Sequence, residues 1–520
     1  MVRLSRQRAG ELIYGYLSVA GLTNLRCYLI NSLSSGRYSI LSRRQLLEGA
    51  ASVAAVSWIP GCGYHANSPS GPVAPDPVPG ASAVQGSVVV MESTIGSVPS
   101  RFMGLSYEKL AMSYSYFHAA NHNLIALFRR LGKGVLRIGG GSVDHILWTA
   151  SDTGTHLQVS PANIRGLATF LQATEWVCLY GVNLATSNPE MAAEEAAYVA
   201  AILGPNLIGL EIGNEPDEYG VAGNFFAGAW TFEDFLSRWN LFRSAILEAA
   251  PQIPITGPAA GGGNHISTWT LPFAQAVTSG EITLLTQHYY RASGASPSST
   301  AAFLLTPDTQ LATDLSALYA GAQQVGIPYR LSECNSFFNG GAAGVSDSFA
   351  SSLWVVDFLF NAAMGGATGV NLHGGGNGPG YTPIADDSGS VLEARPEYYG
   401  LLLFTLMGTG NLLETQLSAG NAAATAYALR TESGGLNVML VNKDTQNLTL
   451  TVEAGQIIHS ASMQLMTAPN LSATTGVTIQ GASVNRDGGF SPAASVTLSA
   501  TGSQTTCSIP GLSAALVCIT

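Results

Sequence analysis

Charged residues are scarce in this sequence, and basic ones are scarcer than acidic ones. They make up 11% of the 520 residues, with 22 Lys and Arg against 33 Asp and Glu, and the net charge is −11. Binding of nucleic acid needs a basic face that neutralises phosphates, and no run of Lys or Arg supplies one, so the composition argues against such partners. The hydrophobic fraction of 46% instead predicts a globular body whose surface is covered by small polar residues and glycine.

Cysteine is also scarce, with six residues in the chain. The sequence has no CxxC pair and no cluster of His and Cys, which argues against zinc, and we predict neither a metal nor a cofactor. Cys178 and Cys334 lie in or beside predicted strands, where a thiol acts as a small apolar side chain. Cys507 and Cys518 lie on what are predicted to be adjacent strands, which leaves a disulfide between them open.

The apolar stretch near the N-terminus, Leu46–Ile59, is too short and too weakly hydrophobic to span a membrane. It follows Arg43 and Arg44, and this order is typical of a twin-arginine export signal, although a cytoplasmic amphipathic helix is the alternative. We therefore predict a signal and leader over residues 1–62 and a flexible linker over residues 63–84. Cys62 loosely resembles a lipoprotein cleavage site, so the exported protein is predicted to be periplasmic, extracellular or lipid-anchored.

Short apolar runs alternate with helical periodicities between residues 101 and 407, which predicts repeated βα units around a parallel sheet. Asn188 and Thr231 precede two of the predicted helices as N-caps. Eight strands in about three hundred residues fit a (β/α)8 TIM barrel, an α/β fold whose active site gathers at the carboxyl ends of the strands. The predicted strands are Phe102–Tyr107, Val135–Ile138, Trp176–Leu184, Leu207–Ile212, Ile255–Gly257, Ile282–Tyr290, Tyr329–Ser332 and Gly369–Leu372.

The residue pattern changes over residues 408–520 to short runs rich in Val, Thr and Leu, which are separated by Gly, Asn and Ser. This pattern predicts a C-terminal antiparallel β-sandwich domain. Residues 85–100 hold a further predicted strand that can pair with it. The domain is interpreted as a module that stabilises the barrel, with an independent sugar-binding role as the alternative.

Two glutamates lie at the carboxyl ends of predicted strands. Barrel enzymes place their catalytic acids at these strand ends. Glu215 follows strand four in Asn214-Glu215-Pro216, and Glu333 closes strand seven just before Cys334 and Asn335, which are expected to begin a loop. Pro216 ends the hydrogen bonding of the strand and restricts the backbone where Glu215 must point. Glycoside hydrolysis needs two such carboxyl groups, one to protonate the leaving oxygen and, in the retaining variant, one to attack the anomeric carbon. Two solvated loop acids are the alternative.

The chain resembles the β-glucuronidase and heparanase family of retaining glycoside hydrolases from about Gln85 to the C-terminus. The resemblance implies that Glu215 is the acid/base, that Glu333 is the nucleophile and that Asn214 binds the sugar 2-hydroxyl. Asn-Glu-Pro alone is shared by a clan of barrel glycosidases, so the combination is what makes the resemblance specific. It is carried by Phe102-Met-Gly-Leu-Ser-Tyr-Glu108, Leu136-Arg-Ile-Gly-Gly-Gly-Ser142, Ile212-Gly-Asn-Glu-Pro216, Leu331-Ser-Glu333 and Ala394-Arg-Pro-Glu-Tyr-Tyr399.

Four further positions are candidates for the site. The period of two places His288 and Tyr290 on one face of strand six, where the family has a Tyr that contacts the nucleophile, and core packing is the alternative. Arg137 can hold Glu333 ionised or form a structural salt bridge in the barrel floor. Glu108 matches an acid that contacts sugar hydroxyls in relatives, with a solvated side chain as the alternative.

The segment Asn371–Tyr381 is rich in glycine and is expected to follow strand eight. In the family, a loop of this kind with a Tyr grips the substrate carboxylate, so Gly380 and Tyr381 are the candidates here. A mobile lid is the competing interpretation. Gly141 stands where some relatives carry a hydroxyl, so Ser142 can take over that sugar contact.

These observations predict an exported, monomeric β-glucuronidase that removes terminal glucuronic acid by double displacement without a cofactor. The second hypothesis is a retaining glycosidase that acts on neutral sugars such as glucosides or xylosides. It would keep both glutamates. A catalytically silent carbohydrate-binding protein is the third. Whether cleavage is terminal or internal depends on loop shape and stays open.

Overall fold

The computed structural model describes residues 83–114, 116–221, 223–226, 228, 230–277 and 280–520. The predicted export signal, Cys62 and all but the last two residues of the predicted linker lie outside these ranges. Among the helices of the described ranges, none combines the length and the apolar character that a membrane span requires.

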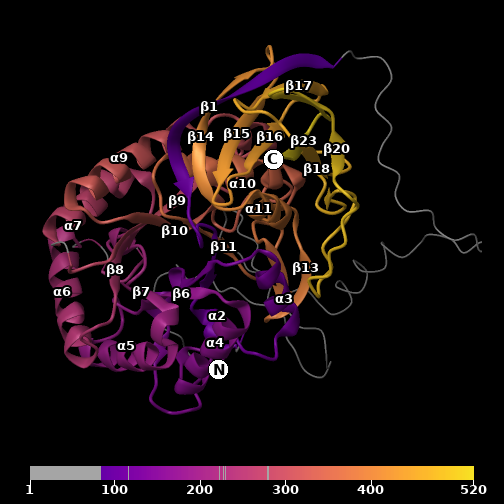
Figure 1. Ribbon diagram of the computed structural model, residues 1–520. Coiled ribbons are helices and arrows are strands. Elements are labelled where there is room, and N and C mark those ends of the chain that lie inside the picture. The colour runs from indigo at the N-terminus through magenta and orange to yellow at the C-terminus, as the bar shows by residue number, and fades with distance from the viewer. Residues whose placement is uncertain (1–82, 115, 222, 227, 229, 278–279) are drawn as a thin grey trace, which may run out of the picture. The chain divides into compact units, whose positions relative to one another are not determined.

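Eight parallel strands close into a barrel, which confirms the predicted fold (Figure 1). Most of their residues are buried, as expected for strands enclosed between a packed interior and a ring of helices. All eight predicted strands are present, in the cyclic order β10-β11-β2-β3-β6-β7-β8-β9. Their bounds are β2 Gly104–Glu108, β3 Val135–Gly139, β6 Val177–Val182, β7 Leu207–Ile212, β8 Ile255–Ala260, β9 Leu284–Ser293, β10 Tyr329–Phe338 and β11 Val370–Gly374.

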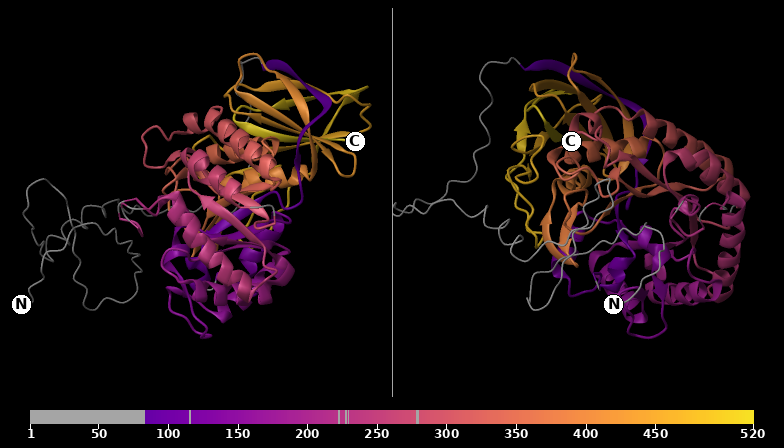
Figure 2. Two further views of the ribbon diagram at one scale, coloured as in Figure 1. Left: turned by 90° about the vertical axis from the view of Figure 1, so that its left-hand side faces the viewer. Right: turned by 180° about the vertical axis from the view of Figure 1, so that it is seen from behind.

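The helices between the strands surround the barrel (Figure 2). Two of them begin as predicted: the Asn188 side chain accepts a hydrogen bond from the amide of Met191, and Thr231 forms a capping box with Asp234. The α-helices are α2 Leu110–Ser113, α3 His122–Arg130, α4 Pro161–Thr174, α5 Pro189–Leu203, α6 Phe232–Ala249, α7 Leu271–Ala276, α8 Ala301–Leu304, α9 Thr309–Val325, α10 Phe349–Met364 and α11 Pro396–Met407. Two small ladders lie in the connections, β4 Leu147–Trp148 with β5 Gln158–Val159, and β12 Ile384–Asp387 with β13 Ser390–Ala394.

The β-domain is one eleven-stranded sheet in which every neighbouring pair is antiparallel except β1 with β17. As predicted, the strand before the barrel joins this sheet, and it pairs with β14 on one side and β17 on the other. Val438 and Leu450, from opposite halves of the sheet, belong to one buried cluster, so the sheet curls around its own core. The strands are β1 Val84–Val98, β14 Gly410–Ser418, β15 Ala424–Thr431, β16 Leu436–Asn442, β17 Leu448–Glu453, β18 Ala461–Thr467, β19 Thr478–Ile479, β20 Val496–Leu498, β21 Ala500–Thr501, β22 Gln504–Ile509 and β23 Ser513–Ile519.

The disulfide left open between Cys507 and Cys518 is not formed, and both thiols are free. The two cysteines lie on β22 and β23, which are not neighbours in the sheet: β22 pairs with β17 and β21, whereas β23 pairs with β16 and β18. The expectation of adjacent strands was therefore wrong, because the order of strands in the sheet does not follow their order in the sequence.

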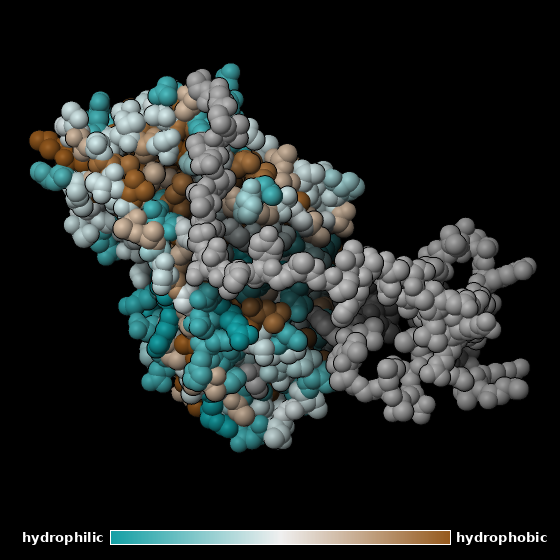
Figure 3. All heavy atoms as spheres, turned by 90° about the vertical axis from the view of Figure 1, so that its right-hand side faces the viewer, coloured by the Kyte–Doolittle hydropathy of each residue, from teal (hydrophilic) through white to brown (hydrophobic). Residues whose placement is uncertain are grey.

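The sheet packs against α10 and α11 of the barrel. A largely buried ion pair fixes this contact, since Lys443 Nζ lies 2.5 Å from Asp357 Oδ2. Thr425 and Tyr427 donate to the other oxygen of the same carboxylate. On the face shown in Figure 3, hydrophobic residues lie in separate small groups among hydrophilic ones.

Candidate active site

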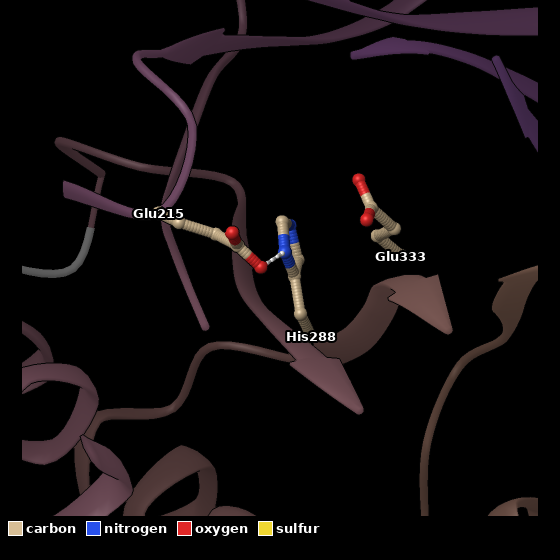
Figure 4. Close-up of side chains that lie close together, drawn as sticks. All are labelled: Glu215, His288 and Glu333. Carbon is tan, nitrogen blue, oxygen red and sulfur yellow. Dashed lines mark hydrogen bonds and ion pairs between the residues drawn. The ribbon is translucent and has the colours of Figure 1, made fainter. Parts of the chain in front are cut away.

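Glu215 and Glu333 lie close together at the carboxyl ends of the barrel strands (Figure 4). One carboxylate oxygen of each, together with a ring nitrogen of His288, lie within 4.8 Å of one another. The Glu215 side chain is 33% exposed, whereas that of Glu333 is 9% exposed. Carboxyl groups about 5 Å apart suit direct attack by one carboxylate, whereas an inverting water needs a gap of roughly 6.5 Å or more.

The backbone at Glu215 is held in an unusual conformation. Its φ of 47° lies in the left-handed region that residues other than glycine rarely adopt. Its amide donates to the carbonyl of Ala259 over 2.9 Å, and Pro216 starts a short 3-10 helix, Pro216–Glu218. The chain thus turns sharply at the end of β7 and directs the glutamate over the barrel.

A β-bulge sets the direction of Glu333. In the pairing of β10 with β9, Leu331 is opposite Gln287 and Glu333 is opposite His288, so Ser332 is an extra residue. The strand then continues to Phe338. The expectation that Cys334 begins a loop was therefore wrong, because the pairing with β9 resumes after the bulge.

Arg137 is fully buried and connects the two sides of the site. Its Nη1 donates to Glu333 Oε2 over 2.7 Å, and its Nε donates to Glu211 Oε2 over 2.6 Å. The arginine thus makes both the contact predicted with the nucleophile and a salt bridge in the barrel floor. Burial alone would raise the pKa of Glu333, but the positive charges of His373 and Arg137 and a hydrogen bond from Tyr290 outweigh it and hold that pKa well below its usual range. Glu333 is therefore ionised, which is the state that its predicted role requires.

The imidazole of His288 lies between Arg137 and Glu215. Arg137 Nη2 is 3.1 Å from His288 Nε2, and His288 Nδ1 is 2.9 Å from Glu215 Oε1. A guanidinium can only donate, so Nε2 must accept and Nδ1 must carry the proton. His288 is therefore a donor to Glu215.

The side-chain amide of Asn214 is also oriented by its contact with Arg137. Its Oδ1 accepts from Arg137 Nη2 over 2.9 Å, which fixes the amide so that Nδ2 points elsewhere. Its backbone amide donates to Asp144 Oδ2, a buried carboxylate that also accepts from the hydroxyl of Tyr219. The position predicted to bind the sugar 2-hydroxyl thus offers a preorganised amide donor.

Tyr290 donates from its hydroxyl to Glu333 Oε1 over 2.8 Å, so it lies where the family resemblance places a tyrosine. The ring of Tyr381 stacks on it, with centroids 5.9 Å apart and planes 28° from parallel. The phenol of Tyr381 thus lies on the ring of the residue that donates to Glu333.

Gly380 is placed differently from the expected carboxylate grip. Its amide donates to the carbonyl of Gly378 over 2.9 Å, and the amide of Tyr381 donates to Gly340. In this conformation neither amide is available to an anion. The segment predicted to follow strand eight also begins later, because Asn371 and His373 still belong to β11.

Glu108 is partly exposed but held by defined partners. Its Oε2 accepts from both the amide and the hydroxyl of Ser142, so that hydroxyl orients Glu108. His373 Nε2 lies 3.5 Å from Glu108 Oε1, and His373 Nδ1 lies 3.7 Å from Glu333 Oε2. Burial lowers the pKa of His373, but the two carboxylates on either side of it, Glu333 foremost, raise it above the ordinary value of a histidine. The imidazole of His373 thus lies between two acids whose charges favour its protonated form.

No family model matches the sequence. Two fungal proteins named β-glucuronidase do: one from Aspergillus niger is 24% identical over 423 residues, which cover 68% of this chain and 76% of that protein. The other, from Neurospora crassa, is 23% identical over 414 residues, or 69% of this chain and 72% of that protein. These matches confirm the resemblance drawn from the motifs. The chain is a glycoside hydrolase related to the β-glucuronidases.

Solved structures of glycoside hydrolases share the hydrolase's fold. A 4-O-α-L-rhamnosyl-β-D-glucuronidase from Fusarium oxysporum aligns with a TM-score of 0.69 at 18% identity, over 84% of this chain and 100% of that one. An arabinofuranosidase from Xanthomonas axonopodis aligns with a TM-score of 0.59 at 16% identity, and a xyloglucanase from Paenibacillus polymyxa with 0.58 at 10% identity. Both cover 84% of this chain and nearly all of their own.

Three residues of the hydrolase's site were missed in the sequence. Asp144 anchors the turn that carries Asn214, Glu211 pairs with Arg137, and His373 lies beside Glu333. Glu211 had a readable signal, because an acid inside an apolar strand needs a buried cation as a partner. The partners of Asp144 and His373 are brought together only by closure of the barrel.

Among the residues that the structure describes, two groups of side chains have a spacing that could hold a metal ion. The first is Glu215, His288 and Glu333, and the second is Asp217, Glu218 and His265. In the first, Arg137 already supplies a fixed positive charge to Glu333, which disfavours a second cation. In the second, both oxygens of Asp217 accept from the amide of Gly261, and one also pairs with His265 Nδ1 at 2.5 Å. These bonds already satisfy the carboxylate without a metal.

Proposed function

We propose that this glycoside hydrolase is a retaining β-glucuronidase that releases terminal β-linked glucuronic acid by double displacement. The observation that carries the mechanism is the separation of Glu215 and Glu333, within 4.8 Å between their nearest oxygens. An ionised Glu333 at that distance attacks the anomeric carbon directly.

In the first step, Glu333 Oε forms a bond to the anomeric carbon while the glycosidic C–O bond breaks. Glu215 gives its proton to the departing oxygen, and Asn214 Nδ2 donates to the 2-hydroxyl. In the second step, Glu215 takes a proton from water, whose oxygen attacks the same carbon and displaces Glu333. The free sugar is released, Glu215 again carries its proton, and one water has been consumed.

The choice of a glucuronide is supported by the names of the two fungal relatives and by the surroundings of Glu333. The Tyr381 phenol and the imidazole of His373, whose pKa is raised by Glu333 and Glu108, are both next to the nucleophile, where they favour an anionic sugar over a neutral one. The rings of His373 and Tyr381 lie 5.9 Å apart, edge to face, so they can act on the same substituent. Arabinofuranosidases and a xyloglucanase share the fold, so a neutral glycoside is the second candidate.

A panel of 4-nitrophenyl β-glycosides tests the substrate class. The purified protein should release nitrophenol from the glucuronide with kcat/KM at least about tenfold higher than from the glucoside or xyloside. A preference for either neutral sugar would replace the proposal with the second candidate. Binding without turnover of any glycoside would indicate a silent carbohydrate-binding protein.

We further propose that the protein acts as a monomer after export by the twin-arginine route, with Cys62 as the residue that would carry a lipid anchor. The support is the sequence around Arg43, Arg44 and Cys62. Replacing both arginines by lysine should retain the protein in the cytoplasm of a host with a twin-arginine pathway. Unchanged export would contradict that route.

A further inference from the structure

The loop that carries Tyr381, residues 375–381, is fixed at its base by two side chains. Thr382 Oγ1 accepts from the amide of Gly375 over 3.0 Å, and Asp386 Oδ2 accepts from the amide of Gly376 over 2.9 Å. Both contacts lie next to β11, so they leave the middle of the loop to be held by something else.

Arg395 holds the middle of this loop. Its Nη1 donates to the carbonyl of Gly378 over 2.6 Å and its Nη2 to the carbonyl of Asn377 over 2.8 Å. Such charge-assisted bonds are stronger than neutral ones, and the rigid fork of a guanidinium suits two acceptors at once. The arginine is itself anchored, because its amide donates to Pro383 and its side chain is only 10% exposed.

The far end of the loop rests on the turn that follows β10. The amide of Tyr381 donates to the carbonyl of Gly340 over 3.1 Å, and a Cβ at Gly380 would overlap that same carbonyl oxygen. Only glycine permits this close approach. The loop is therefore clamped between Arg395 on one side and the turn after the nucleophile's strand on the other.

We propose that Arg395 is a positioning residue for substrate recognition in this enzyme. By holding the carbonyls of Asn377 and Gly378, it keeps Tyr381 stacked on Tyr290, which in turn donates to Glu333. Arg395 acts on binding of the sugar rather than on the bond-making groups, because its hydrogen bonds go to the loop. The identity of the sugar that this loop binds rests on the proposed function, whereas the role of Arg395 in holding the loop does not.

Steady-state kinetics on the preferred glycoside, in the full chain, test this role. Arg395→Ala should raise KM about tenfold or more, because two charge-assisted hydrogen bonds are lost, and should change kcat by no more than about threefold. Arg395→Lys should recover part of the loss, since an ammonium can donate to one carbonyl but cannot form the fork. The matched control is Glu393→Gln. Glu393 Oε1 lies 3.6 Å from Arg395 Nε on a half-exposed side chain, and its loss should leave both constants unchanged.

Hydrogen–deuterium exchange gives a readout that does not depend on the substrate. In Arg395→Ala, the amides of residues 375–382 should exchange faster while peptides from the barrel strands keep their wild-type rates. If Arg395→Ala does not fold, Arg395→Lys and Arg395→Gln are measured in its place.

An unchanged KM together with unchanged exchange would overturn the proposal, as would a loss confined to kcat. Failure to hydrolyse glucuronides, with KM on another glycoside still raised in Arg395→Ala, would overturn the proposed substrate and leave the clamp standing.

Discussion

His288 and Glu215 are joined by a hydrogen bond whose direction is fixed from the far side of the imidazole ring. Nδ1 lies 2.9 Å from Glu215 Oε1, while Nε2 faces Arg137, which can only donate. One chain of hydrogen bonds therefore runs from Glu215 through His288 and Arg137 to Glu333. The two carboxylates are positioned by a shared framework rather than independently.

Two variants of His288 separate its two hydrogen bonds. The amide of an asparagine reaches about as far as Nδ1, and that of a glutamine about as far as Nε2. We expect His288→Asn to keep a donor for Glu215 and to lose about tenfold in kcat/KM, whereas His288→Gln should lose about a hundredfold or more. The difference should grow with glycosides that have poor leaving groups, since these depend most on the acid. Equal losses on good and poor leaving groups would show that His288 only fills space.

Replacing Glu333 and replacing Glu215 should have different effects on turnover. Glu333→Gln should lower kcat by about four orders of magnitude or more, since no nucleophile remains. Glu215→Ala should keep turnover of activated phenyl glycosides and should be accelerated by azide, which yields a β-glycosyl azide with retained configuration. Proton NMR of the first product from the wild-type enzyme should show the β-anomer. Rescue of Glu333→Ala by azide with retained configuration would reverse the two roles.

The sequence predicted the barrel well because its strands are continuous buried runs with clear ends, and Glu215 because Pro216 marks the end of β7. It missed the length of β10, since the bulge at Ser332 and the pairing beyond it depend on β9. It anticipated the contact of Arg137 with Glu333 but missed Glu211 as the second partner of Arg137, because the two residues meet from far along the chain. Local patterns indicate which residues are unusual, whereas only the closed barrel decides which of them are partners.

Asn214 provides a prediction that can be checked with a modified substrate. With its Oδ1 bound to Arg137, its Nδ2 should donate to the sugar 2-hydroxyl. Asn214→Ala should lower kcat/KM by about a hundredfold on the normal glycoside, because this bond strengthens in the transition state. On the 2-deoxy glycoside, wild type and variant should be nearly equal. A similar loss on both sugars would indicate that Asn214 supports Arg137 and does not touch the substrate.

Tyr381→Phe tests how the sugar acid is recognised. The variant keeps the ring that stacks on Tyr290 and removes only the hydroxyl. Loss of one charge-assisted hydrogen bond should cost about 1.5 to 3 kcal/mol, or roughly tenfold or more in kcat/KM for the glucuronide. The same constant for the glucoside should barely change, since that sugar lacks the carboxylate. Equal losses on the two sugars would show that Tyr381 supports Tyr290 instead.

Glu397, at the start of α11, should make the stability of the protein depend on pH. Its carboxyl group is buried, and burial raises its pKa to about 8 although Asn335 donates to it over 3.2 Å. Among the described residues its other oxygen has no hydrogen-bond partner, which agrees with a neutral acid. In the unfolded chain a glutamate titrates near pH 4.3, so between that value and about 8 the folded state binds a proton that the unfolded state does not.

The free energy of unfolding should therefore receive its full contribution from Glu397 below about pH 4.3 and lose it as the pH rises to about 8, by a few kcal/mol. Glu397→Gln removes this titration. Urea unfolding between pH 5 and pH 8.5 should show a smaller decline for the variant than for the wild type, and the slopes are compared because the amide changes the absolute stability. Glu194→Gln, at an exposed position of α5, should reproduce the wild-type slope. Parallel curves for wild type and Glu397→Gln would mean that Glu397 is ionised in the folded protein, and that the decline comes from the histidines that titrate in the same range.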